Sequence, residues 1–140
     1  MSTTEHKYRG GHVAVVTGAA MGIGYAIAHR LAEDGNDVAI FDLNAEVGAA
    51  AAEKIAAETG ARVICCVVDV ADRDQVAAAV ARVRGELGPI GILVNNAGIE
   101  QFGPFTEITP EGWNRVMEVN LTGTFHCTQL TVGDMIAARW

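Results

Sequence analysis

Short apolar runs alternate along the chain with longer segments in which apolar residues recur at helical spacing. The apolar runs are residues 13–16, 38–41, 63–68 and 92–94, and each has the length of a buried strand. Helix-spaced segments between such runs are typical of repeated β-α-β units, which build a parallel sheet covered by helices. The pattern therefore predicts an α/β protein with four parallel strands.

The segments between the runs predict helices with recognisable ends. Asn44 and Asp72 are typical N-cap residues, and Gly35 and Gly60 stand where helices should stop. Another helix should begin at Thr109 and continue to the end, bent or broken within residues 120–123. The expected buried stripes are Ile23, Ile27 and Leu31, then Val47, Ala51 and Ile55, then Val76, Val80, Val83 and Leu87.

The length and the net charge of the chain exclude some classes of function. A chain of 140 residues has room for one domain, and we expect a disordered tail over 1–11 and the folded domain over 12–140. The net charge of −7 argues against a nucleic-acid or anionic-membrane surface. Residues 1–11 lack the apolar core of a secretory signal, and no run approaches the roughly 18 apolar residues of a membrane span. These features predict a soluble cytoplasmic protein.

The cysteines predict neither disulfides nor a metal site. Cys65 and Cys66 are adjacent, so on a strand they point to opposite faces and could not form an ordinary disulfide, and the third cysteine is Cys127. No Cys/His spacing fits metal ligation. Buried, reduced thiols are the expected state.

The glycine-rich turn over residues 17–24 carries the first chemical signal. Its glycines are spaced G-x-x-x-G-x-G between a predicted strand and a predicted helix, the context of a dinucleotide-binding turn. Gly18 would allow the tight turn, Gly22 would let backbone amides approach a pyrophosphate, and Gly24 would let the helix pack closely. The helix N-terminus adds partial positive charge. An ordinary tight turn is the alternative interpretation.

Asp42 ends the second predicted strand, 18 residues after Gly24. A carboxylate there can accept hydrogen bonds from the adenosine ribose and would repel a 2′-phosphate. Unit charges 4 Å apart repel by about 4 kcal/mol at an effective dielectric near 20, before screening by salt. No basic residue lies between Gly18 and Gly24 to offset this, so we expect NAD in preference to NADP. A solvated loop carboxylate is the alternative.

Three further motifs complete a family resemblance. Asp69-Val70 follows the third strand, Asn95-Asn96-Ala97-Gly98 follows the fourth, and Met117-Glu118-Val119-Asn120 lies in the next helix. With the glycine-rich turn, their order and separations resemble the N-terminal portion of the short-chain dehydrogenases/reductases, including members like 3-oxoacyl-carrier-protein reductase. The resemblance implies a Rossmann-type doubly wound parallel sheet, truncated after strand four and the following helix. It also implies NAD-dependent hydride transfer with a small alcohol or carbonyl substrate, and a homo-oligomer.

The same resemblance implies roles for individual residues. Asn120 would be the catalytic asparagine, holding a water in a proton relay, although a purely structural role at a helix bend is an alternative. For Asn95 we favour a purely structural role, in which the side chain acts as a staple that holds backbone segments together. The residues implied to border the cofactor are Gly18, Met21, Gly22, Ile23 and Gly24 at the phosphates, Asp42 at the ribose, Asp69 and Val70 at the adenine, and Asn96, Ala97 and Gly98 towards the nicotinamide.

The sequence also departs from the family pattern. The family's serine and Tyr-x-x-x-Lys pair have no counterpart, because the residues four beyond Tyr8 and Tyr25 are His12 and His29. We therefore expect weak or no NAD binding and negligible dehydrogenase activity for this chain alone, since positioned acid–base groups contribute about 10²- to 10⁴-fold. A non-catalytic dinucleotide-binding or interaction module remains an alternative function.

The expected strand order 3-2-1-4 would leave the fourth strand as an unpaired apolar edge. The last helix would expose part of a face formed by Leu121, Phe125, Val132 and Ile136. Both features predict a marginally stable or self-associating chain.

Overall fold

Four parallel strands form one sheet in the order β3-β2-β1-β4 in the computed structural model, which describes residues 10–140. The α/β fold class and the strand order predicted from the sequence are confirmed. Most of the expected tail lies outside the described residues. The strands are β1 (Val13–Thr17), β2 (Asp37–Asp42), β3 (Val63–Val67) and β4 (Ile90–Val94), and the helices are α1 (Gly22–Glu33), α2 (Ala45–Thr59), α3 (Arg73–Glu86), α4 (Pro110–Met117) and α5 (Gly123–Ala138).

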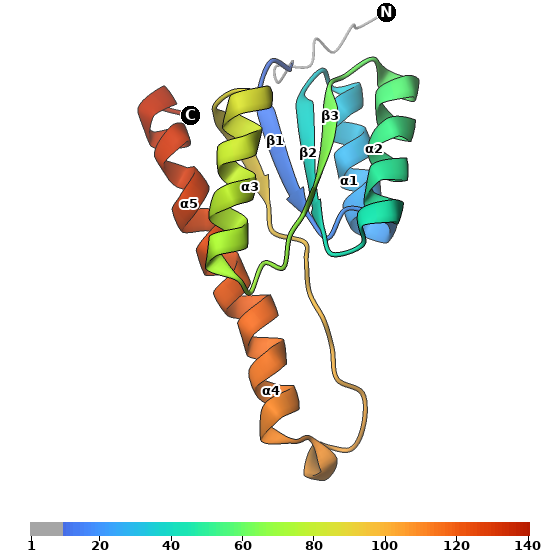
Figure 1. Ribbon diagram of the computed structural model, residues 1–140, viewed down its shortest axis with the longest axis vertical. Coiled ribbons are helices and arrows are strands. Elements are labelled where there is room, and N and C mark those ends of the chain that lie inside the picture. The colour runs from blue at the N-terminus through green and yellow to red at the C-terminus, as the bar shows by residue number, and fades with distance from the viewer. Residues whose placement is uncertain (1–9) are drawn as a thin grey trace, which may run out of the picture.

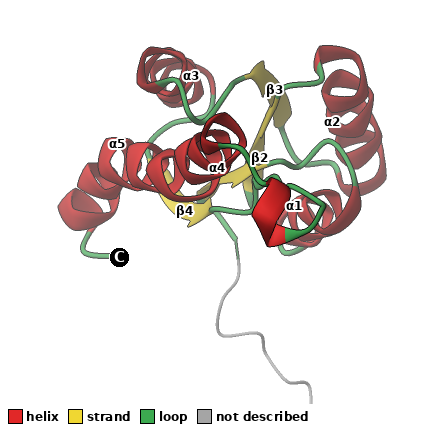
Figure 2. Cartoon of the chain, turned by 90° about the horizontal axis from the view of Figure 1, so that it is seen from below, coloured by secondary structure: helices red, strands yellow, loops and turns green. Residues whose placement is uncertain are grey.

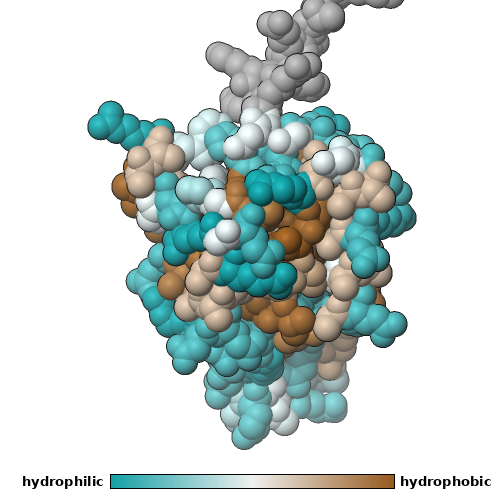
Figure 3. Space-filling model, turned by 45° about the horizontal axis from the view of Figure 1, so that its top comes forward, coloured by the Kyte–Doolittle hydropathy of each residue, from teal (hydrophilic) through white to brown (hydrophobic). Residues whose placement is uncertain are grey.

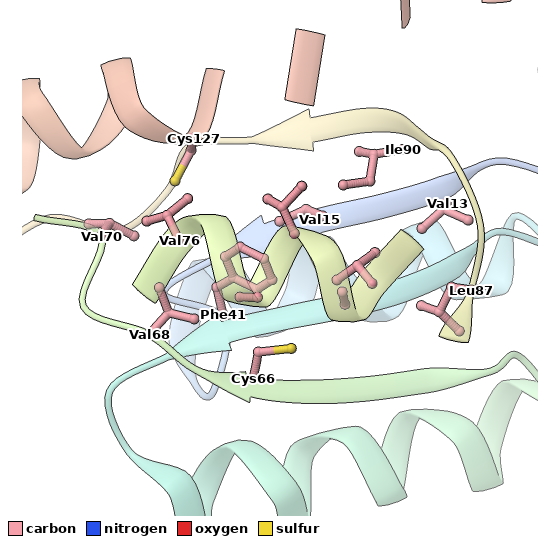
Figure 4. Close-up of a cluster of buried hydrophobic side chains, with 14 of the residues drawn as sticks. Val13, Val15, Phe41, Cys66, Val68, Val70, Val76, Leu87, Ile90 and Cys127 are labelled. Carbon is pink, nitrogen blue, oxygen red and sulfur yellow. The ribbon is translucent and has the colours of Figure 1, made fainter. Parts of the chain in front are cut away.

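Helices cover both faces of the sheet, α1 and α2 on one and α3 and α5 on the other (Figure 2). Alternate residues of a strand point to opposite faces, so Val15 and Phe41 pack beneath α3 (Figure 4). Their neighbours Val16 and Ile40 pack beneath α1 and α2. These strand side chains are at most 1% exposed, which makes the strands nearly continuous apolar runs.

The cysteines follow the same alternation. Cys65 packs with the α1–α2 side, Cys66 lies in the opposite core, and all three thiols, with Cys127, are free. Burial raises the pKa of Cys127 to about 11. As expected, Cys66 and Cys127 are buried, whereas Cys65 is partly exposed.

Helix α1 uses a different buried face from the one predicted. Its buried residues are Gly24, Ala28 and Ala32, whereas Ile23 is 76% exposed. Small side chains let the helix axis approach the sheet, and the larger Ile27 and Leu31 pack along the flanks of that contact. The predicted stripe of isoleucines and leucine was therefore wrong about which residues face the sheet.

The predicted helix ends are confirmed. The side chain of Asn44 accepts the Val47 N–H at 3.0 Å, and that of Asp72 accepts the N–H of Asp74. Gly60 ends α2 in the left-handed region with φ of 77°. These local signals fix where α2 and α3 begin and where α2 ends.

The predicted break in the last helical region is a π-helical segment, η2 (Glu118–Thr122), between α4 and α5. Below the sheet in Figure 1, α4 and the loop before it extend past the carboxyl ends of the strands. A short 3₁₀ turn, η1 (Phe105–Glu107), lies in that loop. The π segment carries Asn120 to the same end of the sheet.

Strand β4 is an edge of the described sheet, with its last four residues only partly buried. Leu121, Phe125 and Ile136 are 54% to 71% exposed, as expected, whereas Val132 is half-buried. Apolar side chains also reach the surface on the face shown in Figure 3. Within residues 10–140, no helix is long and apolar enough to cross a membrane.

Candidate functional site

A cleft of about 290 Å³ opens at the carboxyl end of the sheet. In a doubly wound sheet this end is where ligands bind. Seven of the twelve site residues predicted from the sequence line the cleft. The other five, which do not line it, are Gly22, Ile23, Gly24, Asn96 and Asn120. The lining consists of Gly18, Met21, Phe41, Asp42, Leu43, Val68, Asp69, Val70, Ala97, Gly98, Ile99, Arg115 and Val119.

The glycine-rich turn adopts the conformation that its sequence predicts. Gly18 and Gly22 have φ of 64° and 62°, in the left-handed region that favours glycine. A Cβ on Gly24 would collide with the Gly18 carbonyl and approach Asn96 Nδ2 to 2.5 Å. A Cβ on Gly22 would meet nothing within 4 Å, so Gly22 serves backbone conformation while Gly24 serves close packing.

Asn96 braces this turn from the loop after the neighbouring strand, β4. Its amide group donates to the carbonyls of Thr17 and Gly18, both at 3.0 Å. The buried Thr17 hydroxyl in turn accepts the backbone N–H groups of Asn96 and Ala97. The staple that we assigned to Asn95 belongs to Asn96, because Asn95 Nδ2 donates to the Thr128 side chain instead. Nothing in the sequence pattern distinguished Thr17 as part of the brace.

Asp42 also holds the turn. Its carboxylate accepts the Ala20 N–H through one oxygen and the Asn44 N–H through the other, both at 3.0 Å. The carboxylate therefore lies at the cleft wall, as expected, but each of its oxygens already has an N–H partner. Those N–H dipoles offset part of its negative charge. The repulsion of a 2′-phosphate expected from the sequence had assumed a full, uncompensated unit charge on Asp42.

The Asp69-Val70 dipeptide is fixed by contacts from three helices. The Asp69 N–H donates to Gln75 Oε1 at 2.9 Å, and His126 Nδ1 donates to the Val70 carbonyl at 3.1 Å. Arg115 Nη2 donates to Asp69 Oδ2 at 2.8 Å. Within residues 10–140 the Val70 N–H has no hydrogen-bond partner, which leaves a donor at the cleft wall for a ligand.

Asn120 pairs with the backbone of Ile99 in both directions. Its Oδ1 accepts the Ile99 N–H and its Nδ2 donates to the Ile99 carbonyl, each at 2.8 Å. The Thr124 hydroxyl donates to the Asn120 carbonyl at 3.0 Å. The side chain thus ties the loop after β4 to the π segment.

Arg115 is the cleft residue that the sequence reasoning missed. It lies on α4, and its side chain reaches Asp69, 46 residues earlier. Among the described lining residues it is the one cation, beside the carboxylates of Asp42 and Asp69. Its position in the sequence gives no pattern by which it could be recognised, because the contact with Asp69 depends on where α4 lies.

The other candidate acid–base groups of the described chain are elsewhere. Tyr25 on α1 packs against the α1–α2 core, and its hydroxyl is buried without a partner among the described residues. Lys54 Nζ lies 5.8 Å from the centre of the Tyr25 ring. Neither residue lines the cleft, and residues 10–140 contain no cluster of three metal-ligating side chains.

The sequence model of the short chain dehydrogenase family matches residues 12–140. The chain belongs to this family. The fold agrees, because the chain superimposes on L-sorbose reductase from Gluconobacter frateurii with a TM-score of 0.88 and 33% identity, over 93% of this chain and 49% of that one. The resemblance identified from the sequence is therefore confirmed.

Several short-chain dehydrogenase relatives share more than a third of their aligned residues with the chain. A 3-oxoacyl-[acyl-carrier-protein] reductase (FabG) from Chlamydia muridarum is 37% identical over 126 residues, 90% of this chain and 51% of that protein. D-threitol dehydrogenase from Mycolicibacterium smegmatis is 43% identical over 129 residues, 91% of this chain and 49% of that protein. The chain thus spans about half the length of the curated relatives it matches.

The preference for NAD expected from Asp42 was wrong. L-sorbose reductase is complexed with NADPH. A gluconate 5-dehydrogenase from Burkholderia cenocepacia, 40% identical with a TM-score of 0.83 over 91% of this chain and 50% of that one, is in complex with NADP. Similar short-chain dehydrogenases therefore carry the phosphorylated dinucleotide. The physical error was to treat Asp42 as a bare charge facing the ribose, whereas it accepts two backbone N–H groups.

Proposed function

We propose that the chain is the cofactor-binding part of an NADP(H)-dependent oxidoreductase that interconverts an alcohol and a carbonyl compound. The observation that carries this proposal is the cleft, which brings the glycine-rich turn, Asp69-Val70 and the Ala97-Gly98 loop to one end of the sheet. The complexes of similar chains with NADPH or NADP support the choice of dinucleotide.

The residues present fit such a cofactor. The turn ends at the N-terminus of α1, whose first N–H groups and dipole suit a pyrophosphate. The open space at Gly22 leaves room for phosphate oxygens beside the backbone. At the other wall, the Asp69 carboxylate can accept from an exocyclic amine while the Val70 N–H donates to a ring nitrogen. Ala97 and Gly98 would border the nicotinamide-side ribose.

When bound, the nicotinamide ring supplies or accepts a hydride. This chain's own residues would bind and orient the dinucleotide, and the Asn96 brace keeps the turn from shifting. We assign Asn120 to the nicotinamide end, where it holds Ile99 in place. Through this contact it would set the shape of the cleft around the reacting ring.

Calorimetric titration of the chain with NADPH tests the proposal through two glycine variants. Gly22 and Gly60 both have positive φ, and a Cβ on either would meet nothing within 4 Å. Both alanine substitutions therefore cost similar backbone strain. Of the two glycines, Gly22 alone belongs to the glycine-rich turn beside the cleft. We expect Gly22→Ala to lose NADPH affinity and Gly60→Ala to keep it. The sequence alone led us to expect weak or no binding by this chain, whereas the assembled cleft leads us to expect that it binds NADPH. A wild-type chain that is folded and binds no NADPH contradicts the proposal, as do two variants that bind equally well.

A further inference from the structure

The ion pair between Arg115 and Asp69 joins the two walls at one end of the cleft. Asp69 follows β3, whereas Arg115 lies on α4, which projects beyond the sheet (Figure 1). Among the described α4 residues, Arg115 is the one whose side chain hydrogen-bonds to a residue of the sheet and its loops. Its Nη1 also lies 3.9 Å from Glu118 Oε2, so the guanidinium is held from its own side as well.

The contacts of the Asp69 carboxylate leave it able to bind a further donor. Oδ1 accepts the Ala71 N–H at 2.9 Å and Oδ2 accepts Arg115 Nη2 at 2.8 Å. A carboxylate offers about four acceptor sites on its two oxygens, so two remain. The side chain is 24% exposed, and the residue lines the cleft.

Opposing influences set the charge of this group. Burial raises the pKa of Asp69, but the hydrogen bonds from Arg115 and the Ala71 N–H, with the guanidinium charge, outweigh burial and leave the pKa below its ordinary value. The carboxylate is therefore ionised near neutral pH and can only accept hydrogen bonds. An ionised acceptor attracts an exocyclic amine and repels a carbonyl oxygen in the same place.

We propose that Arg115 is a positioning residue for the base end of the cofactor: it holds the Asp69 carboxylate so that the site selects an aminopurine over a 6-oxopurine. This inference rests on the proposed binding of a dinucleotide in the same cleft. Without the guanidinium, the Ala71 N–H is the one donor among residues 10–140 that remains to orient the Asp69 side chain. Rotation of the carboxylate would then weaken the contact to the amine and relieve the repulsion of a carbonyl.

The test compares two dinucleotides by titration into the 140-residue chain. One is NADPH, and the other is its hypoxanthine analogue, in which a 6-oxo group replaces the 6-amino group of adenine. The variants are Arg115→Gln, Arg115→Lys and, as a matched control, Arg84→Gln. Arg84 pairs with Asp134 at 2.9 Å with side-chain exposures of 42% and 18%, close to the 43% and 24% of Arg115 and Asp69, and neither residue lines the cleft. A general loss of folding stability would therefore show in the control too.

We expect the wild type to prefer NADPH by about five- to tenfold, the range for one charge-assisted hydrogen bond at a part-exposed site. Arg115→Gln should reduce this preference measurably, because the Asp69 part of the discrimination is lost while the Val70 N–H still disfavours the N1–H of hypoxanthine. Arg115→Lys should restore part of the lost preference, and Arg84→Gln should leave the preference unchanged. In an Asp69→Ala background, Arg115→Gln should have no further effect on the ratio, because Arg115 acts through Asp69.

The outcomes separate the two proposals. A wild-type chain that binds neither dinucleotide overturns the proposed function, and the role of Arg115 with it. A wild-type chain that binds both equally well, or an Arg115→Gln chain that keeps the preference, overturns only the role of Arg115. A loss of affinity that is equal for both dinucleotides in Arg115→Gln also overturns it, because this would mean that Arg115 merely docks α4.

Discussion

The side-chain amide of Asn96 donates to the Gly18 carbonyl at 3.0 Å, although 78 residues separate them in the sequence. The same amide donates to the Thr17 carbonyl. This pair of bonds connects the loop after β4 to the turn after β1, so two motifs that the sequence showed separately form one rigid wall. The conformation of the glycine-rich turn thus depends on a residue in the loop after the adjacent strand, β4.

Replacing Asn96 by alanine should destabilise the fold. The substitution leaves the partly buried carbonyls of Thr17 and Gly18 without their donors, and an unpaired buried carbonyl costs about 1–3 kcal/mol. Urea denaturation of wild type and Asn96→Ala measures the loss of unfolding free energy. Asn96→Asp should lose at least as much, because a carboxylate would face two carbonyl oxygens. An aspartate variant as stable as the wild type would refute the brace.

Gly24→Ala should destabilise the chain because of its close packing. The new Cβ would collide with the Gly18 carbonyl, a backbone atom that cannot move without moving the turn. Overpacking of this kind costs roughly 1–3 kcal/mol. The control is Gly85→Ala on α3, where a Cβ meets nothing within 4 Å, and there we expect a gain of about 0.5–1 kcal/mol from helix propensity. Thermal melts with opposite shifts would confirm this account, and a neutral Gly24→Ala would contradict it.

Asp42→Ala should weaken binding of NADPH and NADH by a similar factor. The carboxylate supports the turn by accepting the Ala20 N–H and the start of α2 by accepting the Asn44 N–H. Its loss should loosen a wall that both dinucleotides contact. Parallel titrations measure the two affinities, with Asp42→Asn as the control that keeps one acceptor oxygen. A loss confined to one of the two dinucleotides would show that Asp42 discriminates between them.

The stability of the fold should depend on Asp134 in acid. Hydrogen bonds from Arg84 and from the Ile90 N–H, together with the Arg84 charge, outweigh burial and hold the pKa of Asp134 below its ordinary value of 3.8. Because its pKa is lower in the folded state than in the unfolded state, ionised Asp134 stabilises the fold at pH values above the ordinary pKa. That stabilisation disappears as the pH falls through the lower, folded-state pKa. Wild type should therefore be more stable than Asp134→Asn at neutral pH, with the difference shrinking below about pH 4. Denaturation at several pH values checks this, and a difference that does not change with pH would contradict it.

Surface composition predicts self-association of the chain. Leu121, Phe125 and Ile136 are exposed on η2 and α5, and β4 is an edge of the described sheet. Edge strands and exposed apolar faces favour contacts between copies. Sedimentation velocity should show a concentration-dependent increase in mass that Phe125→Glu with Ile136→Glu reduces. A wild-type chain that stays monomeric at every concentration would refute the prediction.

Local signals explain why much of the fold could be predicted from the sequence. The N-cap of Asn44 and the left-handed Gly60 depend on neighbours within a few residues. The β-α-β alternation predicted a parallel sheet, and the strand order followed from the Rossmann-type fold that the family resemblance implied. The buried face of α1 was wrong because residue size, rather than apolar spacing alone, determines how closely a helix packs, and Gly24 with Ala28 forms that contact.

The site was less predictable where it depends on long-range contacts. Glycines and acidic residues at strand ends could be recognised from their spacing, whereas Thr17 and Arg115 acquire their roles only when β4 and α4 are in place. The charge of Asp42 was visible in the sequence, but the two N–H groups that it accepts were not. That missing information led to the wrong choice of dinucleotide.

The central claim is that the cleft at the carboxyl end of the sheet binds NADPH. Amide chemical-shift mapping of the isotopically labelled chain during titration with NADPH tests it most directly. The account predicts saturable shifts concentrated at residues 18–24, 69–70 and 97–99, with the amides of α2 and α3 beyond their first turns little changed. Saturable shifts at another surface, or a folded chain whose cleft amides do not respond, would contradict it.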